Sequence, residues 1–164
     1  MVATTETALG ELNVSALQLI IDAHCRVAWI GQNLRKSMAS VSPEEASWRP
    51  PGAKHNIAEI ALHCAYWKNR VRHRLVGDRR KSFPRVGSDW FPVENTLSAA
   101  GWDEIKAITE EEHTQLADAI SALDPSEMSH KQFDHATHHI TGIAMHDAYH
   151  VGQMQLIRAM WGRE

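Results

Sequence analysis

Several features are scarce or missing in this sequence of 164 residues. It has two cysteines, Cys25 and Cys64, and no CxxC pair, so we expect free thiols in a reducing cytoplasm. No apolar stretch approaches the length of a membrane span, and the N-terminal residues do not resemble a secretory signal. The formal net charge of −3 leaves no basic excess to neutralise a phosphate backbone. These absences argue against a membrane protein, a nucleic-acid-binding protein and a disulfide scaffold.

Histidine, by contrast, is abundant. The chain has eleven histidines, none of them in a terminal tag, and its composition is otherwise that of an ordinary globular protein, with 43% hydrophobic and 23% charged residues. We therefore expect a single domain over residues 1–164. A buried histidine is costly without a partner, so the excess requires an explanation.

Apolar residues recur at steps of three and four along most of the chain, and no strand pattern competes with them. The expected helices span about residues 10–40, 56–77, 95–123 and 137–161. We expect a proline-rich loop at 42–54, and a second loop of about 19 residues at 77–95. The pattern predicts an all-α protein, a four-helix bundle with a long loop between its second and third helices.

The last expected helix carries the strongest chemical signal. His146 and His150 lie on its apolar stripe, between Ile143 and Met154. Side chains at positions i and i+4 lie on one side of a helix and can bind one ion. Neutral imidazole is a good ligand for zinc, nickel, copper or iron(II). The alternative is that both histidines form hydrogen bonds in a buried polar pocket.

A third ligand has to come from another helix. His63 borders the apolar stripe of the second expected helix, between Ile60 and Trp67. His24 borders the stripe of the first helix in a similar way and is the second candidate. Cofactor sites in helical bundles form between side chains on facing helices, although a lone histidine at such an interface is more often structural.

Two segments together resemble the DinB-like superfamily: AEIALHCAYWKNRV and MHDAYHVGQMQLIR, of which the HDAYHVGQ phrase is the more specific. The resemblance covers nearly the whole chain and implies a small four-helix fold. In the family pattern, a histidine midway along the second helix joins an HxxxH pair on the last helix. His63, His146 and His150 match these positions, so the resemblance implies that they form a metal-binding triad.

Other residues near the expected site have open roles. Asp147 either bonds a ligand imidazole on another helix or is a surface or interhelical carboxylate. Glu112 on the third helix either supports a ligand or acts as a general base, or it lies in solvent, and His113 competes for the same role. Tyr149 and Gln153 could orient the ligands. The loop after the second helix combines aromatic with basic residues, so it is either a lid over the site or a surface loop pinned by its aromatics.

The resemblance implies a divalent metal cofactor, with zinc or nickel ahead of iron and manganese. It also implies a small-molecule substrate, with thiol S-transfer, using a low-molecular-weight thiol, or hydrolysis as the reaction. Whether the protein is an enzyme is left open, and the alternative is a non-catalytic metal-binding or stress-related dimer. A homodimer is expected from apolar residues beyond the core, such as Trp29 and Met160. Neither a nucleic-acid nor a membrane partner is expected.

Overall fold

The computed structural model describes residue 17 and residues 31–78 and 82–162. The described residues form helices and connecting segments, without a strand. The helices are α2 (Leu34–Ala39), α3 (Pro43–Ser47), α4 (Ile57–Leu75), α5 (Ala99–Ser121), a short 3-10 helix η1 (Pro125–Glu127) and α6 (His130–Met160). None of the described helices is long and apolar enough to cross a membrane.

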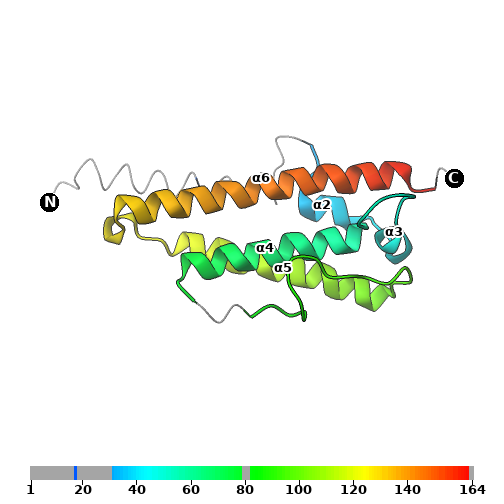
Figure 1. The fold of residues 1–164 in the computed structure, drawn as a ribbon, viewed down its shortest axis with the longest axis horizontal. Helices are drawn as coiled ribbons and strands as arrows, with labels where there is room; N and C mark the ends of the chain where they lie inside the picture. Colours follow the sequence, from blue (N-terminus) through cyan, green and yellow to red (C-terminus); the bar gives the residue numbers. More distant parts are fainter. Residues whose placement is uncertain (1–16, 18–30, 79–81, 163–164) are drawn as a thin grey trace.

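In the described part of the chain, the long helices α4, α5 and α6 run side by side along the long axis (Figure 1). Helix α4 packs against both α5 and α6, and it is antiparallel to α6 but parallel to α5 (Figure 1). The short helices α2 and α3 lie near the C-terminal half of α6 and the start of α4 (Figure 1). This arrangement confirms the predicted all-helical bundle, and it places the middle of α4 opposite the middle of α6.

Helix α4 begins and ends where the sequence predicted. Asn56 caps it, and a capping box joins Asn56 to Glu59. Gly77 follows the end of the helix with a φ of 68°, a conformation that glycine adopts without strain. The local signals therefore fix the length of the helix that carries His63.

The first predicted helix is not continuous. Its part over residues 10–30 lies outside the described residues, except Leu17, and residues 31–33 are not helical. Gly31 has a φ of 106°, and the side chain of Asn33 accepts a hydrogen bond from the main-chain N–H of Lys36. A positive φ followed by a capping residue starts a new helix, α2, inside the segment that apolar periodicity alone had joined.

Three other helix boundaries were predicted wrongly. The loop expected at 42–54 contains α3, which Ser42 caps. Helix α5 is capped by Ser98, not by Asn95 or Thr96. Helix α6 begins at His130, seven residues before Thr137, because Ser129 and Gln132 form a capping box. The first two turns of α6 are mostly polar, so apolar periodicity did not reveal them.

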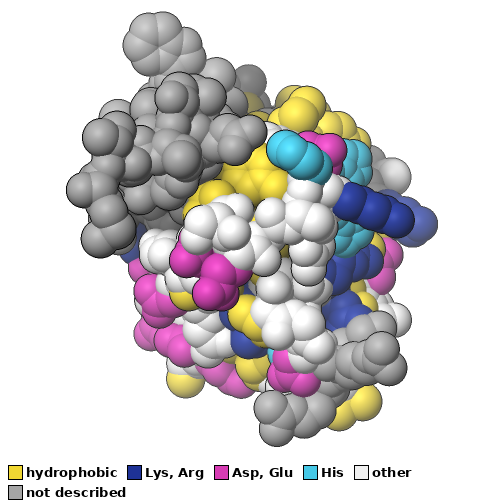
Figure 2. All heavy atoms as spheres, turned by 90° about the vertical axis from the view of Figure 1, so that its left-hand side faces the viewer, with side chains coloured by type: hydrophobic (Ala, Val, Ile, Leu, Met, Phe, Trp, Pro, Cys, Tyr) yellow, Lys and Arg dark blue, Asp and Glu magenta, His cyan; other side chains and the backbone are white. Residues whose placement is uncertain are grey.

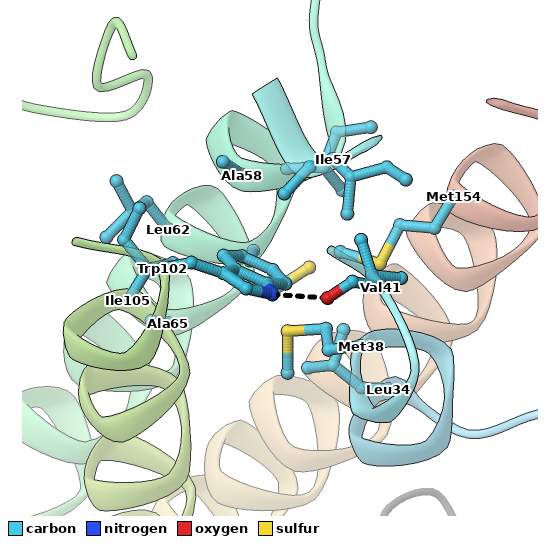
Figure 3. Packing of buried hydrophobic residues seen from close by; sticks show 14 of the residues in the cluster. Leu34, Met38, Val41, Ile57, Ala58, Leu62, Ala65, Trp102, Ile105 and Met154 are labelled. Carbon is cyan, nitrogen blue, oxygen red and sulfur yellow. Dashed lines mark hydrogen bonds between the residues drawn. The ribbon is translucent and has the colours of Figure 1, made fainter. Parts of the chain in front are cut away.

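The hydrophobic core lies between these helices. Trp102 is 2% exposed, and its indole N–H donates to the carbonyl oxygen of Val41 at 2.8 Å. Aliphatic and methionine side chains from α2, α4, α5 and α6 surround this indole (Figure 3). A second cluster, which includes Leu116 and Ile140, fills the other half of the bundle. These two clusters hold α4 and α6 at a fixed spacing, which positions the side chains between them.

Candidate metal centre

The three histidines singled out from the sequence lie together between α4 and α6. His63 and His150 are each 5% exposed, and His146 is partly exposed. His63 lies one helical turn from Trp67, and the other two lie one turn apart on α6. The structure thus brings together imidazoles from two distant segments of the chain.

The Nε2 atoms of the three rings converge. Nε2 of His146 lies 3.0 Å from Nε2 of His63 and 3.2 Å from Nε2 of His150. A tetrahedral ion with nitrogen ligands at 2.0–2.1 Å would hold those nitrogens about 3.3 Å apart. The three rings therefore form a buried cluster that could bind one metal ion, and the ligand atoms all lie within 4.8 Å of one another.

The opposite ring nitrogens determine where the protons lie in two of these histidines. Nδ1 of His63 is 2.9 Å from the carbonyl oxygen of Asp89, which can only accept, so Nδ1 carries the proton. Nδ1 of His150 is 2.6 Å from Oε1 of Gln153, which also accepts. In the neutral rings, both Nε2 atoms consequently hold lone pairs. His146 can donate one proton to only one of them, whereas a cation would satisfy all three rings.

Burial keeps two of these rings neutral. Burial, with a further contribution from His146, lowers the pKa of His150 to about 4. Burial also lowers the pKa of His63, against the opposing effect of its hydrogen bond to Asp89. Metal binding requires the neutral form of imidazole, so the apolar surroundings favour the ligand state of both side chains near neutral pH.

The segment between α4 and α5 covers one side of the cluster. The indole of Trp90 stacks on the ring of His63 at a centroid distance of 3.8 Å and on the ring of His55 at 3.5 Å. Phe91 is 4% exposed, and Phe83 packs against the same core cluster. Both expectations for this loop describe part of it, since its aromatics pin it to the core and Trp90 covers a histidine of the site.

Asp147 is an interhelical carboxylate. It forms an ion pair with Lys68 of α4, and both side chains are at most 2% exposed. Its Oδ1 lies 3.8 Å from Nδ1 of His146, which has no hydrogen bond with any of the described residues. Asp147 therefore does not bond a ligand imidazole on another helix, although it approaches the outer nitrogen of its neighbour on α6.

The other candidates from the sequence lie elsewhere. Glu112 is buried as predicted, but it bonds Nδ2 of Asn69 at 3.0 Å and pairs with Arg72 at 3.6 Å instead of a ligand. His113 is buried on α5 and does not belong to the three-histidine cluster. His24 lies outside the described residues.

Cys64 is fully buried in the core, as predicted. Its sulfur also belongs to a second set of ligand atoms within 4.8 Å of one another, formed with His146 and Asp147. Because Asp147 is paired with Lys68, this set is a weaker candidate for a metal than the three histidines.

Asp89 and His55 were not predicted from the sequence as residues of the site. Asp89 bonds His63 through its carbonyl oxygen, and its carboxylate accepts from the indole N–H of Trp67 at 2.8 Å. Its φ of 65° is uncommon for a residue other than glycine and typical of turns. The only signal in the sequence was the Asp-Trp pair, Asp89 and Trp90, in a loop without periodicity.

The orienting role predicted for Gln153 and Tyr149 agrees with the structure. Gln153 bonds His150, and its Nε2 donates to the hydroxyl of Tyr149 at 3.0 Å. Partners of this kind fix the ring orientation of metal-binding histidines.

Comparison with known proteins supplies the family. A family model described as the DinB superfamily matches residues 26–154, which is more than half of the chain and includes all three histidines. The comparisons with curated proteins and with solved structures gave no match. The family match agrees with the helical fold and with the resemblance seen in the two histidine-bearing segments. The chain therefore belongs to the DinB superfamily.

Proposed function

We propose that this protein is a metal-dependent enzyme that acts on a small molecule, with His63, His146 and His150 holding one divalent ion. The observation that carries the proposal is the convergence of three Nε2 atoms, of which two hold lone pairs because their Nδ1 atoms donate elsewhere. Three protein ligands leave coordination positions for another molecule, as in catalytic sites; structural zinc sites usually have four.

The residues around the histidines support this assignment. Trp90 excludes water from one face of His63, and Gln153 holds the ring of His150. A divalent ion held there would supply Lewis acidity, which polarises a carbonyl or lowers the pKa of a thiol or water molecule. Thiol S-transfer and hydrolysis are both consistent with this chemistry. Zinc and nickel suit a site of nitrogen ligands, and iron or manganese are alternatives.

Metal analysis of matched variants tests the site. We expect purified wild-type protein, loaded with zinc or nickel and desalted, to retain about one ion per chain, and His146→Ala to retain far less. His135→Ala is the control, because His135 and His139 form an exposed pair on the same helix with the same spacing and an Nε2–Nε2 distance of 3.0 Å. Equal metal content in wild type and His146→Ala would remove the proposal.

A second candidate function is metal binding without catalysis. The stacking of Trp90 on His63 favours it, because it shelters the site on one side. Cobalt-loaded protein separates the two candidates. A visible spectrum that changes when azide or a small thiol is added indicates an open coordination position, and an unchanged spectrum favours the non-catalytic role. Thiol transfer to an alkyl halide, or ester hydrolysis, should then exceed the rate of His150→Ala if the protein is an enzyme.

A further inference from the structure

A groove beside the metal centre suggests what kind of molecule reaches it. A cavity of about 190 Å³ lies between α4 and α6, and His146 forms one of its ends. Trp67, Val71 and Ile143 supply its apolar wall. Two larger cavities lined by described residues, of about 520 and 470 Å³, contain none of the three histidines. We call the smaller cavity the α4–α6 groove.

The far end of the groove is basic. Arg74, His138 and His139 line it there. Arg74 is exposed, and it forms no ion pair with a carboxylate of the residues that the structure describes. Burial, and next the positive charges of His135 and Arg74, lower the pKa of His139, so this histidine is mostly neutral near pH 7 and the fixed positive charge at this end is that of Arg74. The end of the molecule that contains the start of α6 shows histidine side chains gathered beside lysine and arginine side chains (Figure 2).

Helix geometry sets the length of the groove. His146 and His139 are seven residues apart on α6, and Trp67 and Arg74 are seven residues apart on the antiparallel α4. Seven residues of α-helix span about 10 Å. The groove thus runs about 10 Å from His146, past apolar side chains, to an arginine that has no carboxylate partner among the described residues.

From this arrangement we infer that the α4–α6 groove binds the substrate, and that the substrate has a short apolar body with a carboxylate about 10 Å from the group that reaches the metal. Arginine recognises a carboxylate through paired hydrogen bonds, which favours it over a neutral polar group. The volume is below the range of drug-sized pockets, so the body is small. The inference depends on the proposed metal centre and adds the class of molecule to it.

Thiol probes test the inference without assuming a reaction. The thiolate of 8-mercaptooctanoate can bind the metal while its carboxylate reaches Arg74, and 8-mercaptooctanamide is its neutral counterpart. With cobalt-loaded protein, the thiolate-to-cobalt absorption band reports binding of either probe. We expect the carboxylate probe to bind wild type about tenfold more tightly than the amide. The short pair, 3-mercaptopropionate and 3-mercaptopropionamide, cannot span the groove and should show no such preference.

Two arginine variants test whether Arg74 causes the preference for the carboxylate probe. Arg74→Gln should abolish the preference for the carboxylate probe and leave the affinity for the amide unchanged. Arg70→Gln is the control, because Arg70 lies one turn away on α4 over the ring of Tyr66, at 5.5 Å, and should keep the preference.

The outcomes separate the groove from the metal centre. If wild type binds cobalt but binds the carboxylate and the amide equally, or binds neither thiol, the groove assignment is wrong and the metal centre stands. A preference for the carboxylate probe that persists in Arg74→Gln would also show that the groove assignment is wrong. If wild type takes up no metal, the proposed function fails first, and the groove assignment fails with it.

Discussion

Nδ1 of His63 donates to the carbonyl oxygen of Asp89, 26 residues later in the chain. The side chain of the same aspartate lies 3.2 Å from Nδ1 and accepts from the indole of Trp67. The segment between α4 and α5 is thereby tied to a histidine of the three-histidine cluster. The structure gives this loop a defined role, because it orients the imidazole that comes from α4.

The first prediction concerns Asp89. We expect Asp89→Ala to weaken zinc affinity about 10- to 100-fold, because alanine loses the bond to Trp67 and disfavours the left-handed backbone that presents the carbonyl oxygen to His63. Asp89→Asn should stay much closer to wild type, since asparagine tolerates this conformation and keeps a side-chain acceptor. Competition with a chromophoric chelator measures both affinities. Wild-type affinity in Asp89→Ala would show that the loop does not orient His63.

The second prediction concerns Trp90. Its ring lies between His55 and His63, with interplanar angles of 5° and 8°. Trp90→Ala should speed zinc loss to excess chelator about tenfold, because stacked aromatic contacts stabilise the closed arrangement. Trp48→Ala is the control, since Trp48 contacts Trp161 away from the cluster. Equal release rates for the two variants would contradict a covering role for Trp90.

The third prediction concerns the buried ion pair of Lys68 and Asp147. Lys68→Met leaves a carboxylate buried without its cation, so we expect the free energy of unfolding to fall by about 3–5 kcal/mol. Removing both charges in Lys68→Met/Asp147→Leu should cost less than the sum of the single variants. Urea denaturation measures these values. Arg35→Ala, which removes the exposed pair with Glu110, should change stability by about 1 kcal/mol or less.

The fourth prediction concerns the pH dependence of stability. Burial acts to raise the pKa of Glu59, but its hydrogen bonds with Arg49, the main-chain N–H of Val93 and His55 outweigh burial and lower the pKa below 4.5. A carboxyl whose pKa is lower in the folded state stabilises the protein fully above its unfolded pKa. This contribution is lost as the pH falls from about 4.5 through the folded value.

The variant Glu59→Gln tests whether the lowered pKa of Glu59 makes the protein less stable as the pH falls. The stability of wild type should fall more steeply than that of Glu59→Gln below about pH 4.5, because the variant has no proton to bind at this position. Thermal unfolding between about pH 6 and pH 3 measures the difference. Parallel curves for the two proteins would contradict the lowered pKa of Glu59.

The sequence predicted the parts of the site that helix periodicity controls. His146 and His150 could be paired because residues four apart on a helix share a face, and the apolar stripe indicated that this face is buried. The third ligand could not be chosen in this way, because His63 on α4 and His24 on the first predicted helix border their apolar stripes in similar ways. Choosing His63 required the resemblance to a family.

Other parts could not be predicted from periodicity. The contact of Asp89 uses a main-chain oxygen in a left-handed residue, and neither feature has a strong sequence pattern. The start of α6 was predicted too late for a different reason. Ser129 and Gln132 have the spacing of a capping box, but the turn that follows them is mostly polar, so apolar periodicity did not mark it as helical. The break at Gly31 was hidden by apolar residues that continue at helical spacing on both sides of it.

Helix α6 is unbroken over His130–Met160, and it carries His139 at one end of the groove and His146 at the other. The two histidines therefore lie on one continuous helix, so the distance between them does not change when a loop moves. If the groove binds the substrate as proposed, this fixed distance would favour molecules of matching length. Inserting a single residue between positions 139 and 146 would turn one end by about 100° relative to the other, so the register of α6 limits which molecules can fit.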